Sequence, residues 1–278
     1  MSLGVLAAVL VGAFLHAAWN ALIKTGADKL QGMLMLTWGH AAVGAVMALA
    51  LGLPDPASWG WLAASVLIHC AYQSFLALAF THGDLSRVYP ISRGAAPLIV
   101  TALGALWLPD RLGAAEYAGI LVLGAGILAM ARGVFTDGES RRLLPFAFGA
   151  ACATAAYTLA DGQGARLAGS AGAYLAWLFM LSAVVFTPLA VRLGGSAVLR
   201  PSRRALLGGL GAGAMSVAAY WIAVWAMTRA PIALVAALRE TSILFAMLIG
   251  VLAFGERLGA RKALAGALIL GGVILTRL

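Results

Sequence analysis

Charged residues are scarce in this sequence. Asp, Glu, Lys and Arg make up 10% of the 278 residues, and hydrophobic residues make up 63%. An average soluble domain carries roughly 25% charged residues. A soluble fold of this length cannot bury so much apolar surface, because much of any folded surface stays in contact with water. Intrinsic disorder is excluded because it requires a low apolar content. The composition therefore predicts an all-α integral membrane protein.

Cysteines and the motifs of common catalytic sites are also scarce. Cys70 and Cys152 lie inside apolar segments without CxxC spacing, so they predict neither a disulfide framework nor a metal pair. The four histidines occupy different segments and lack the spacing of metal ligands. The sequence contains no Walker A, HExxH or GxSxG motif. We therefore expect no catalytic residue, no metal site, no cofactor and no associated ATPase.

Ten apolar segments are separated by short polar connections. A membrane-spanning helix needs about 20 predominantly apolar residues, and charges, glycines and prolines mark where each segment stops. The predicted spans are residues 3–23, 32–53, 60–81, 86–108, 114–132, 143–161, 170–191, 205–228, 232–254 and 260–276. Gly209 and Gly213 have GxxxG spacing, which predicts close contact between helices within the chain.

Basic residues are distributed unevenly between the two sets of connections. The odd-numbered connections carry thirteen lysines and arginines, whereas the even-numbered connections and the C-terminus carry four, namely Arg111, Arg166, Arg229 and Arg277. Positively charged loops stay in the cytoplasm. This predicts a multi-pass protein of a bacterial inner membrane with both termini outside, in the periplasm of a Gram-negative cell. The N-terminus lacks a basic n-region, so the first apolar segment is expected to remain as a span. Because the charges are scattered, the net charge of +9 does not predict nucleic-acid binding.

An offset of 146 residues relates the two halves of the sequence. It aligns Pro109-Asp110-Arg111-Leu112-Gly113 with Gly255-Glu256-Arg257-Leu258-Gly259. The same offset aligns Arg93 with Arg239, Gly104 with Gly250, and Gly126 with Gly272. Each half holds five predicted spans, an odd number, so tandem copies insert with opposite orientations. We predict ten transmembrane helices in two inverted five-helix repeats, residues 1–137 and 138–278. Many secondary transporters have this plan, with the substrate site near the midplane.

Further motifs accompany the repeated turn. His16-Ala17-Ala18-Trp19-Asn20 lies in the first predicted span, and Tyr89-Pro90 and Ala96-Pro97-Leu98 lie in the fourth. With the acidic-Arg-Leu-Gly turns, these motifs resemble the drug/metabolite transporter superfamily, in its ten-span EamA-type branch, over essentially the whole chain. The nearest resemblance is to exporters of aromatic and hydrophobic amino acids. It implies a secondary carrier that exports small metabolites through a central cavity lined by spans 1, 3, 4, 6, 8 and 9.

Polar residues inside the predicted spans are the candidates for substrate binding. Such residues are costly to expose to lipid, so they usually face protein or a cavity. Residues three or four apart share one helix face, and this spacing defines polar and aromatic stripes on five of the implied cavity helices. The candidates are His16, Trp19, Asn20, Tyr72, Gln73, Tyr89, Arg93, Tyr157, Tyr220, Arg239 and Glu240. Their aromatic rings favour an uncharged or aromatic substrate side chain, and the expected partners are a small molecule and membrane lipid.

The sequence leaves the roles of several candidates open. The histidines either bond across helices or carry protons. Arg93 and Arg239 either bind a substrate carboxylate or Glu240, or extend to the lipid headgroups. Short four-span multidrug members of the superfamily use a carboxylate in their first span, and this sequence has none there. Asp161 is predicted near the end of a span. Facilitated diffusion is therefore at least as well supported as proton antiport.

The alternative class is an integral-membrane enzyme acting on a lipid or isoprenoid substrate. Such an enzyme needs clustered acids or histidines at the membrane surface to bind metal and phosphate. The few acids of this sequence are spread over separate connections. A carrier is therefore favoured.

Overall fold

The computed structural model describes residues 1–23, 29–82, 85–130, 142–255 and 259–278, and all regular secondary structure in these ranges is helical. The helices are α1 (Leu3–Ile23), α2 (Lys29–Leu51), η1 (Pro56–Ser58), α3 (Trp59–His82), α4 (Leu85–Trp107), α5 (Ala114–Met130), α7 (Leu143–Leu167), α8 (Ala171–Gly194), η2 (Ser196–Leu199), α9 (Arg203–Met227), α10 (Ile232–Arg239), α11 (Ser242–Phe254) and α12 (Ala260–Leu275). Every predicted span overlaps at least one of these helices.

Most of the long helices are apolar enough to cross a membrane. Seven stretches of the described residues meet the length and hydropathy of a span: 3–20, 30–51, 56–79, 143–167, 171–194, 203–227 and 232–253. The apolar helices α5 and α12 are shorter, with 17 and 16 residues. The chain is therefore a multi-pass membrane protein. That α4, α5 and α12 also cross the membrane stays a prediction.

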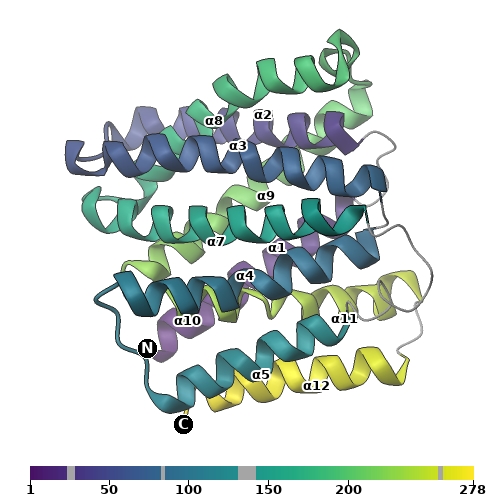
Figure 1. Ribbon diagram of the computed structural model, residues 1–278. Coiled ribbons are helices and arrows are strands. Elements are labelled where there is room, and N and C mark those ends of the chain that lie inside the picture. Colours follow the sequence, from purple (N-terminus) through teal and green to yellow (C-terminus); the bar gives the residue numbers. More distant parts are fainter. Residues whose placement is uncertain (24–28, 83–84, 131–141, 256–258) are drawn as a thin grey trace.

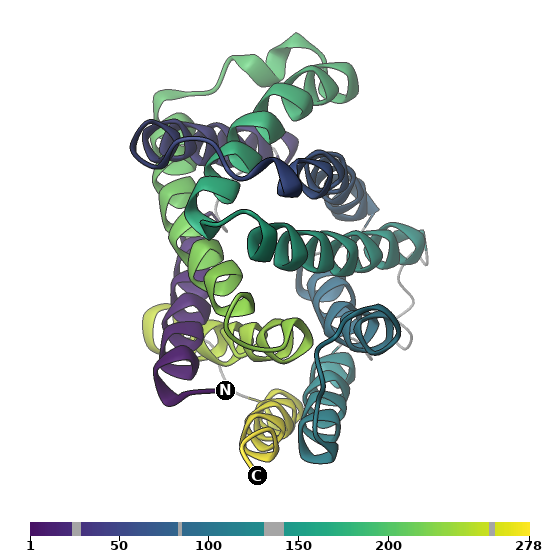
Figure 2. The same ribbon diagram turned by 90° about the vertical axis from the view of Figure 1, so that its left-hand side faces the viewer.

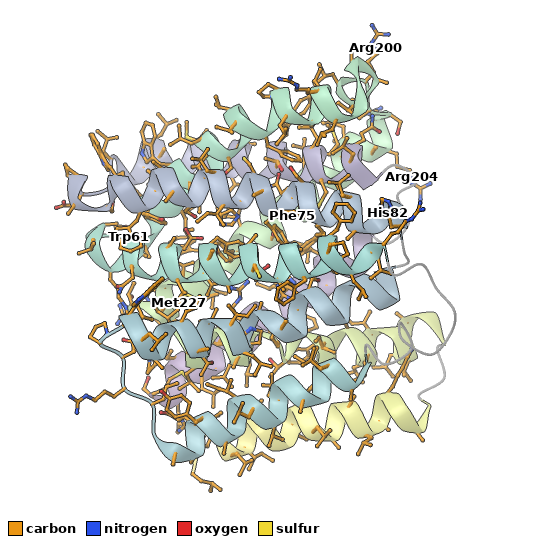
Figure 3. All side chains as sticks on the ribbon, viewed as in Figure 1. Trp61, Phe75, His82, Arg200, Arg204 and Met227 are labelled. Atoms are coloured by element: carbon orange, nitrogen blue, oxygen red, sulfur yellow. The ribbon has the colours of Figure 1, made fainter. Side chains whose placement is uncertain are left out.

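The long helices lie side by side, and both termini lie at the same end of the bundle (Figure 1). We call this end the terminal end and the other the far end. Trp61 and Met227 lie at the terminal end, whereas Arg200 and Arg204 project from the far end (Figure 3). The connections after α2, α4, α7 and α9 lie at the terminal end. Helix α1 starts at the terminal end, whereas α7 starts at the far end, so these two helices run in opposite directions.

Helices from the two halves of the chain pack against one another rather than as separate bundles (Figure 2). The main pairs are α3 with α7, α1 with α9, α2 with α8, α2 with α9, α3 with α8, α4 with α7, α1 with α10 and α11, and α5 with α12. The offset of 146 residues matches α1 with α7, α2 with α8, α3 with α9 and α5 with α12. When each helix of a contacting pair is replaced by its match, the result is in most cases another contacting pair. For example, the contact of α3 with α7 becomes the contact of α9 with α1.

Glycines allow α2 and α9 to approach closely. A Cβ atom added to Gly213 would lie 2.7 Å from the Cα atom of Gly39, and one added to Gly209 would lie 2.3 Å from the Cβ atom of Met35. Such distances are shorter than van der Waals contact, so only glycine fits. The prediction that Gly209 and Gly213 mediate helix contact within the chain is confirmed.

Replacing Gly213 with Ala is expected to lower the free energy of unfolding by about 1–3 kcal/mol, the usual cost of inserting a methyl group into a packed interior. Gly211, in the same helix, is the matched control, because a Cβ atom there would meet nothing within 4 Å. Gly211→Ala should be neutral or stabilising by up to about 1 kcal/mol, since Ala has the higher helix propensity. Unfolding titrations in detergent compare the two variants. Equal effects would contradict the close approach.

The predicted ninth span, 232–254, is not one continuous helix. It divides into α10 and α11 at Glu240 and Thr241. The amides of both residues donate to carbonyls three residues earlier, Ala237 and Leu238, at 3.0 and 3.1 Å. These are the hydrogen bonds of a 3₁₀ turn rather than an α-helix. The Thr241 hydroxyl also donates to the Leu238 carbonyl at 2.7 Å, which stabilises the tighter turn. The break places Arg239 and Glu240 inside the bundle.

Candidate functional site

A buried ion pair joins α4 to the break between α10 and α11. The Nε atom of Arg93 lies 3.0 Å from Oε2 of Glu240, and the two side chains are 4% and 5% exposed. Two charges withdrawn from water at this depth are stable only when they are paired. Arg93 therefore does not extend to the lipid headgroups, and that alternative from the sequence is wrong for this residue. The pair also fixes α4, in the first half of the chain, against the second half.

Arg239, the residue that corresponds to Arg93 in the second half, has a different environment. Its guanidinium carbon lies over the ring of Tyr220, 5.0 Å from the centroid, in a cation–π contact. Its half-buried side chain forms no ion pair or hydrogen bond with the part of the chain that the structure describes. His16 and Glu240 lie within its electrostatic reach. One arginine is thus neutralised by a carboxylate, whereas the other is not.

Helix α1 contributes aromatic groups to the same region. The His16 ring meets the Trp19 ring edge to face, with centroids 5.2 Å apart, and Arg93 and Arg239 lie within electrostatic reach of His16. The indole nitrogen of Trp19 is buried and has no hydrogen-bond partner among the described residues. Buried polar groups normally have a partner. This nitrogen is therefore a donor that a bound molecule can use.

A second buried carboxylate, Asp161 on α7, lies at the centre of a larger hydrogen-bonded cluster. Its side chain is 0% exposed. Oδ1 accepts hydrogen bonds from the Ser65 hydroxyl and, at 3.1 Å, from the Tyr174 hydroxyl. Oδ2 accepts from the Tyr220 hydroxyl at 2.5 Å and lies 2.9 Å from Nε2 of His69. Helices α3, α7, α8 and α9 therefore meet at this carboxylate, and we call these five residues the Asp161 cluster.

Aromatic rings connect the Asp161 cluster with the arginines. The His69 ring stacks on Tyr157 with centroids 4.2 Å apart, and Tyr72 meets Tyr157 edge to face at 5.4 Å. Tyr220 belongs to both regions, because its hydroxyl bonds Asp161 while its ring lies beneath Arg239. The predicted residues Tyr72, Tyr157, Tyr220 and Arg239 thus form one connected group.

Two further predicted residues bond elsewhere, and the side chain of a third is not described. The buried amide oxygen of Gln73 accepts from the Thr37 hydroxyl at 3.3 Å, so Gln73 joins α3 to α2. The side-chain amide of Asn20 donates to the carbonyl of His16 in its own helix at 2.7 Å. Tyr89 lies outside the residues whose side chains are described. The first two residues are explained by helix packing without a ligand.

Asp161 is the functional candidate that sequence reasoning undervalued. The sixth span was predicted to end at residue 161, which placed this carboxylate at the membrane surface, but α7 continues to Leu167. Six further residues at 1.5 Å each place Asp161 about 9 Å from the end of the helix. Two signals were present in the sequence, because Tyr157 precedes Asp161 by four residues and Ser65 precedes His69 by four. Both spacings place a pair of polar side chains on one helix face.

A network of charged hydrogen bonds closes the terminal end of the bundle. Nη1 and Nη2 of Arg166 donate to the two carboxylate oxygens of Asp110, both at 2.9 Å. Arg166 also donates to the carbonyls of Met227 and Ala230 at 2.9 and 3.1 Å. Asp110 accepts from the amide of Ile232, the first residue of α10, at 2.9 Å. We call this network the terminal latch. It ties the connection between α4 and α5 to the last turn of α7 and to the connection between α9 and α10.

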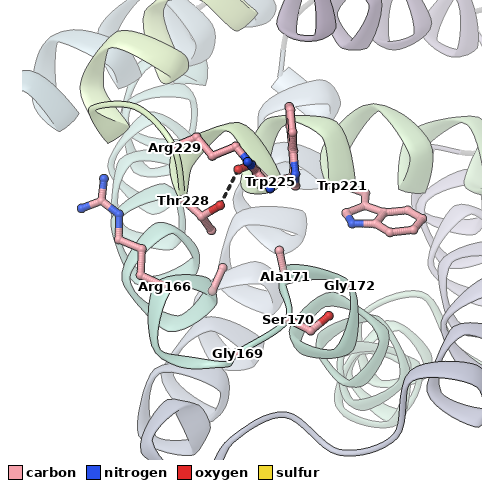
Figure 4. Close-up of a pocket in the computed structure, with 10 residues that line it drawn as sticks. Arg166, Gly169, Ser170, Ala171, Gly172, Trp221, Trp225, Thr228 and Arg229 are labelled. Carbon is pink, nitrogen blue, oxygen red and sulfur yellow. Dashed lines mark hydrogen bonds between the residues drawn. The ribbon is translucent and has the colours of Figure 1, made fainter. Parts of the chain in front are cut away.

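A pocket of about 400 Å³ opens beside the terminal latch (Figure 4). It lies between the α7–α8 connection and the end of α9. The guanidinium carbon of Arg229 lies 4.6 Å from the centroid of the Trp225 ring. The residues that line the pocket are Ala165, Arg166, Gly169, Ser170, Ala171, Gly172, Trp221, Trp225, Thr228 and Arg229.

Comparison with known proteins agrees with this architecture. Residues 142–278 match the EamA-like transporter family. One solved structure, titled "Crystal structure of protein", covers 99% of this chain and 96% of its own, with 21% sequence identity and a TM-score of 0.76. At that identity the likeness concerns the fold. No curated protein matches the sequence. The match of residues 142–278 supports the drug/metabolite transporter superfamily and indicates a membrane transporter of small molecules. The match does not favour a lipid-modifying enzyme.

Proposed function

We propose that this protein is a secondary carrier that exports small carboxylate-bearing metabolites, most simply hydrophobic or aromatic amino acids. The observation that carries the proposal is Arg239, whose half-buried guanidinium lies over the Tyr220 ring and has no carboxylate partner among the described residues. An arginine in a membrane interior is costly and usually serves a function. Its planar fork matches a carboxylate through two parallel hydrogen bonds. A substrate carboxylate therefore supplies the partner that Arg239 lacks.

The surroundings of Arg239 suit the remainder of such a substrate. Glu240 is already paired with Arg93, so the region of these three charged residues has a net charge of about +1, which favours an anionic group. Trp19 of α1 packs on His16, and Tyr72 and Tyr157 are linked to Tyr220 by ring contacts, so these rings offer flat apolar surfaces in the same region. The Trp19 indole nitrogen offers a donor. Aromatic side chains combine a large apolar contact with a polar tip. The central cavity is proposed to lie between these rings and Arg239.

Alternating access is proposed to involve the two halves of the chain as inverted repeats. The offset of 146 residues relates pairs of contacts as well as pairs of residues. A Cβ atom on Gly119 would lie 2.6 Å from the carbonyl oxygen of Gly272, and one on Gly126 would lie 3.0 Å from that of Ala265. The offset carries Gly119 onto Ala265 and Gly126 onto Gly272, so it exchanges these two contacts. Rocking of two such halves around a shared site is the mechanism of many repeat-built carriers.

The orientation proposed from the sequence is kept. Arg200 and Arg204 project from the far end (Figure 3), where the connection between α8 and α9 lies. This is one of the odd-numbered connections, which hold most of the lysines and arginines. By the positive-inside rule the far end is cytoplasmic, and the terminal end faces the periplasm of a bacterial inner membrane. The terminal latch then closes the periplasmic side.

Substitution of Arg239 tests the proposed function. In proteoliposomes, Arg239→Gln should reduce transport of labelled L-phenylalanine by about 10- to 100-fold, because a hydrogen bond to a charged group is worth about 1.5–3 kcal/mol. The same variant should lose the preference of the wild-type protein for phenylalanine over phenylalanine amide, which has no carboxylate. Arg200→Gln is the control, because Arg200 is exposed at the far end.

The two measurements separate a binding role from a structural one. A variant that folds normally, shown by an unchanged thermal transition, but transports both compounds equally poorly supports carboxylate recognition by Arg239. If Arg239→Gln retains full transport and full preference, the carboxylate assignment is wrong. If the wild-type protein exchanges no amino acid of a panel, the substrate class is wrong.

A further inference from the structure

The proposed substrate site leaves the carboxylate of Asp161 without a function. A carboxylate that is 0% exposed inside a membrane protein is costly, and such residues usually belong to a substrate, ion or proton pathway. Asp161 lies on α7, in the half of the bundle nearer the terminal end. Its partners come from three other helices, so its state affects the packing of all of them.

The hydrogen bonds of Asp161 suit an ionised carboxylate. An ionised carboxylate has about four positions that accept hydrogen bonds. Each oxygen of Asp161 has two neighbours that can donate, namely Ser65 and Tyr174 at Oδ1 and His69 and Tyr220 at Oδ2. A protonated Asp161 needs an acceptor for its own hydrogen, so either a hydroxyl group such as that of Tyr220 stops donating to it, or Nε2 of His69 accepts the hydrogen. Gain of a proton therefore changes the hydrogen bonds of the neighbouring side chains.

Tyr220 transmits such a change to the substrate site. Its hydroxyl lies 2.5 Å from Oδ2 of Asp161, and the guanidinium of Arg239 lies over its ring. If the Tyr220 hydroxyl leaves Asp161, the ring beneath Arg239 shifts as well. His69 has less freedom, because its ring stacks on Tyr157 with an interplanar angle of 21°. Tyr220 is thus the direct link between the carboxylate and the arginine.

The pocket at the terminal end comes within about one helical turn of Asp161 along α7. Ala165 lines the pocket of Figure 4 and lies one helical turn beyond Asp161 on the same face of α7. Ala171 lines the same pocket, one turn before Tyr174. The Tyr174 ring packs on Gly164, where an added Cβ atom would lie 2.4 Å from the ring. Tyr174 therefore lies between the pocket and the carboxylate.

Each helix packed against α7 contributes defined groups around Asp161. His69 comes from α3, Tyr174 from α8 and Tyr220 from α9, and Tyr157 of α7 itself lies behind His69. Helices α4 and α10 contribute Arg93 and Arg239, and Glu240 follows α10. His40 of α2 lies within electrostatic reach of His69, and Asp55 caps η1 at the exposed surface. Arg239 contacts the Asp161 cluster through the ring of Tyr220.

We propose that Asp161 is a proton-binding site that couples movement of the substrate to movement of a proton. A hydronium ion that reaches Asp161 from the pocket at the terminal end, past Tyr174, transfers its proton to Oδ2 of Asp161 and leaves a water molecule. The hydroxyl of Tyr220 keeps its own proton but gives up its bond to the carboxyl group. Release of the proton restores the four hydrogen bonds. The coupling to transport rests on the proposed function, whereas proton binding itself does not.

Infrared spectroscopy of the purified full chain tests proton binding without a substrate. Between about pH 8 and pH 5, a range above the ordinary pKa of exposed acids, the wild-type protein should gain the C=O absorption of a protonated carboxyl group. This band should be missing in Asp161→Asn and retained in Glu116→Gln, whose carboxylate caps the first turn of α5 near the surface. In Tyr220→Phe the band should persist but appear at a higher pH, because the ionised carboxylate has lost one of the hydrogen bonds that stabilise it. If Asp161→Asn does not fold, the change of the band in Tyr220→Phe assigns the band to Asp161.

Transport under a pH gradient tests the coupling. Wild-type proteoliposomes should accumulate labelled L-phenylalanine when a pH gradient is imposed. Accumulation should fall about ten-fold in Asp161→Asn, within the usual range of coupling between two sites. The residual uptake of this variant should be the same with and without the gradient. Glu116→Gln should respond as the wild-type protein does.

The outcomes distinguish the two proposals. Absence of a carboxyl band that depends on Asp161 overturns the proton site, whatever the protein transports. A band with an unchanged gradient response in Asp161→Asn overturns the coupling. If the wild-type protein transports no amino acid but shows the band, the proton site stands and the proposed substrate class fails.

Discussion

Glu240→Gln is expected to lower the free energy of unfolding by about 3–5 kcal/mol, the usual result of removing one partner from a buried ion pair. Arg93 would then carry an uncompensated charge at a site where its side chain is 4% exposed. Arg239 adds a second positive charge within electrostatic reach of the same position. Unfolding titrations in detergent measure the change.

A double substitution separates the charge from the shape of the two side chains. Arg93→Gln/Glu240→Gln replaces the ions with two neutral amides that can bond each other, so it should recover more than half of the lost stability. Glu116→Gln is a matched control, because that carboxylate accepts a single bond from the Gly113 amide at 2.8 Å near the surface. Its cost should be about 1 kcal/mol or less. A double variant as unstable as Glu240→Gln would contradict the ion-pair explanation.

Asp110→Ala is expected to open the terminal latch and to lower the free energy of unfolding by about 2–3 kcal/mol. Hydrogen bonds to a charged partner contribute about 1.5–3 kcal/mol, and a helix cap contributes about 1 kcal/mol. Asp110 supplies both, because it binds Arg166 and the amide of Ile232. The side chains of Arg166 and Asp110 are 22% and 17% exposed, so the effect should be smaller than for the Arg93–Glu240 pair.

Asp55→Ala provides a comparison at the same end of the bundle. The Asp55 carboxylate accepts one bond from the Ala57 amide at 2.9 Å and caps the short helix η1. Its loss should cost about 1 kcal/mol. A cysteine at Ala165, which is 4% exposed and lines the pocket, should react faster with a thiol reagent in the Asp110 variant than in the Asp55 variant. Equal reaction rates would show that Asp110 does not close this end.

The positions of the helices could be predicted because each long apolar segment has to satisfy its backbone hydrogen bonds internally. The predicted and observed ends of most helices therefore agree within a few residues, as for 3–23 and α1. The prediction of a continuous ninth span, 232–254, was wrong because side-chain interactions changed the backbone at Glu240 and Thr241. The Thr241 hydroxyl and the Arg93–Glu240 pair favour a turn inside an apolar segment, and hydrophobicity along the sequence does not detect such a turn.

The sequence also identified many of the residues that meet inside the bundle, because polar groups three or four apart in an apolar helix share a face. Tyr72, Tyr157 and Tyr220 were predicted on this basis, and they lie in one connected group with Arg239. The same spacing selected Gln73 and Asn20, which bond to a neighbouring helix and to their own. Spacing reports which residues share a face, but it does not report what that face contacts.

The sequence by itself determined a membrane protein with helical spans, an internal offset of 146 residues and a pair of corresponding arginines. Only the tertiary structure decided which arginine is paired with Glu240 and which lies over a tyrosine ring. The two arginines have the same residue type and related positions, but Glu240 comes within 3.0 Å of Arg93 whereas the Tyr220 ring lies beneath Arg239. The four donors of Asp161 likewise come from residues 13 to 96 positions away in the chain. Electrostatic interactions depend on distance in space, and the packing of helices sets that distance.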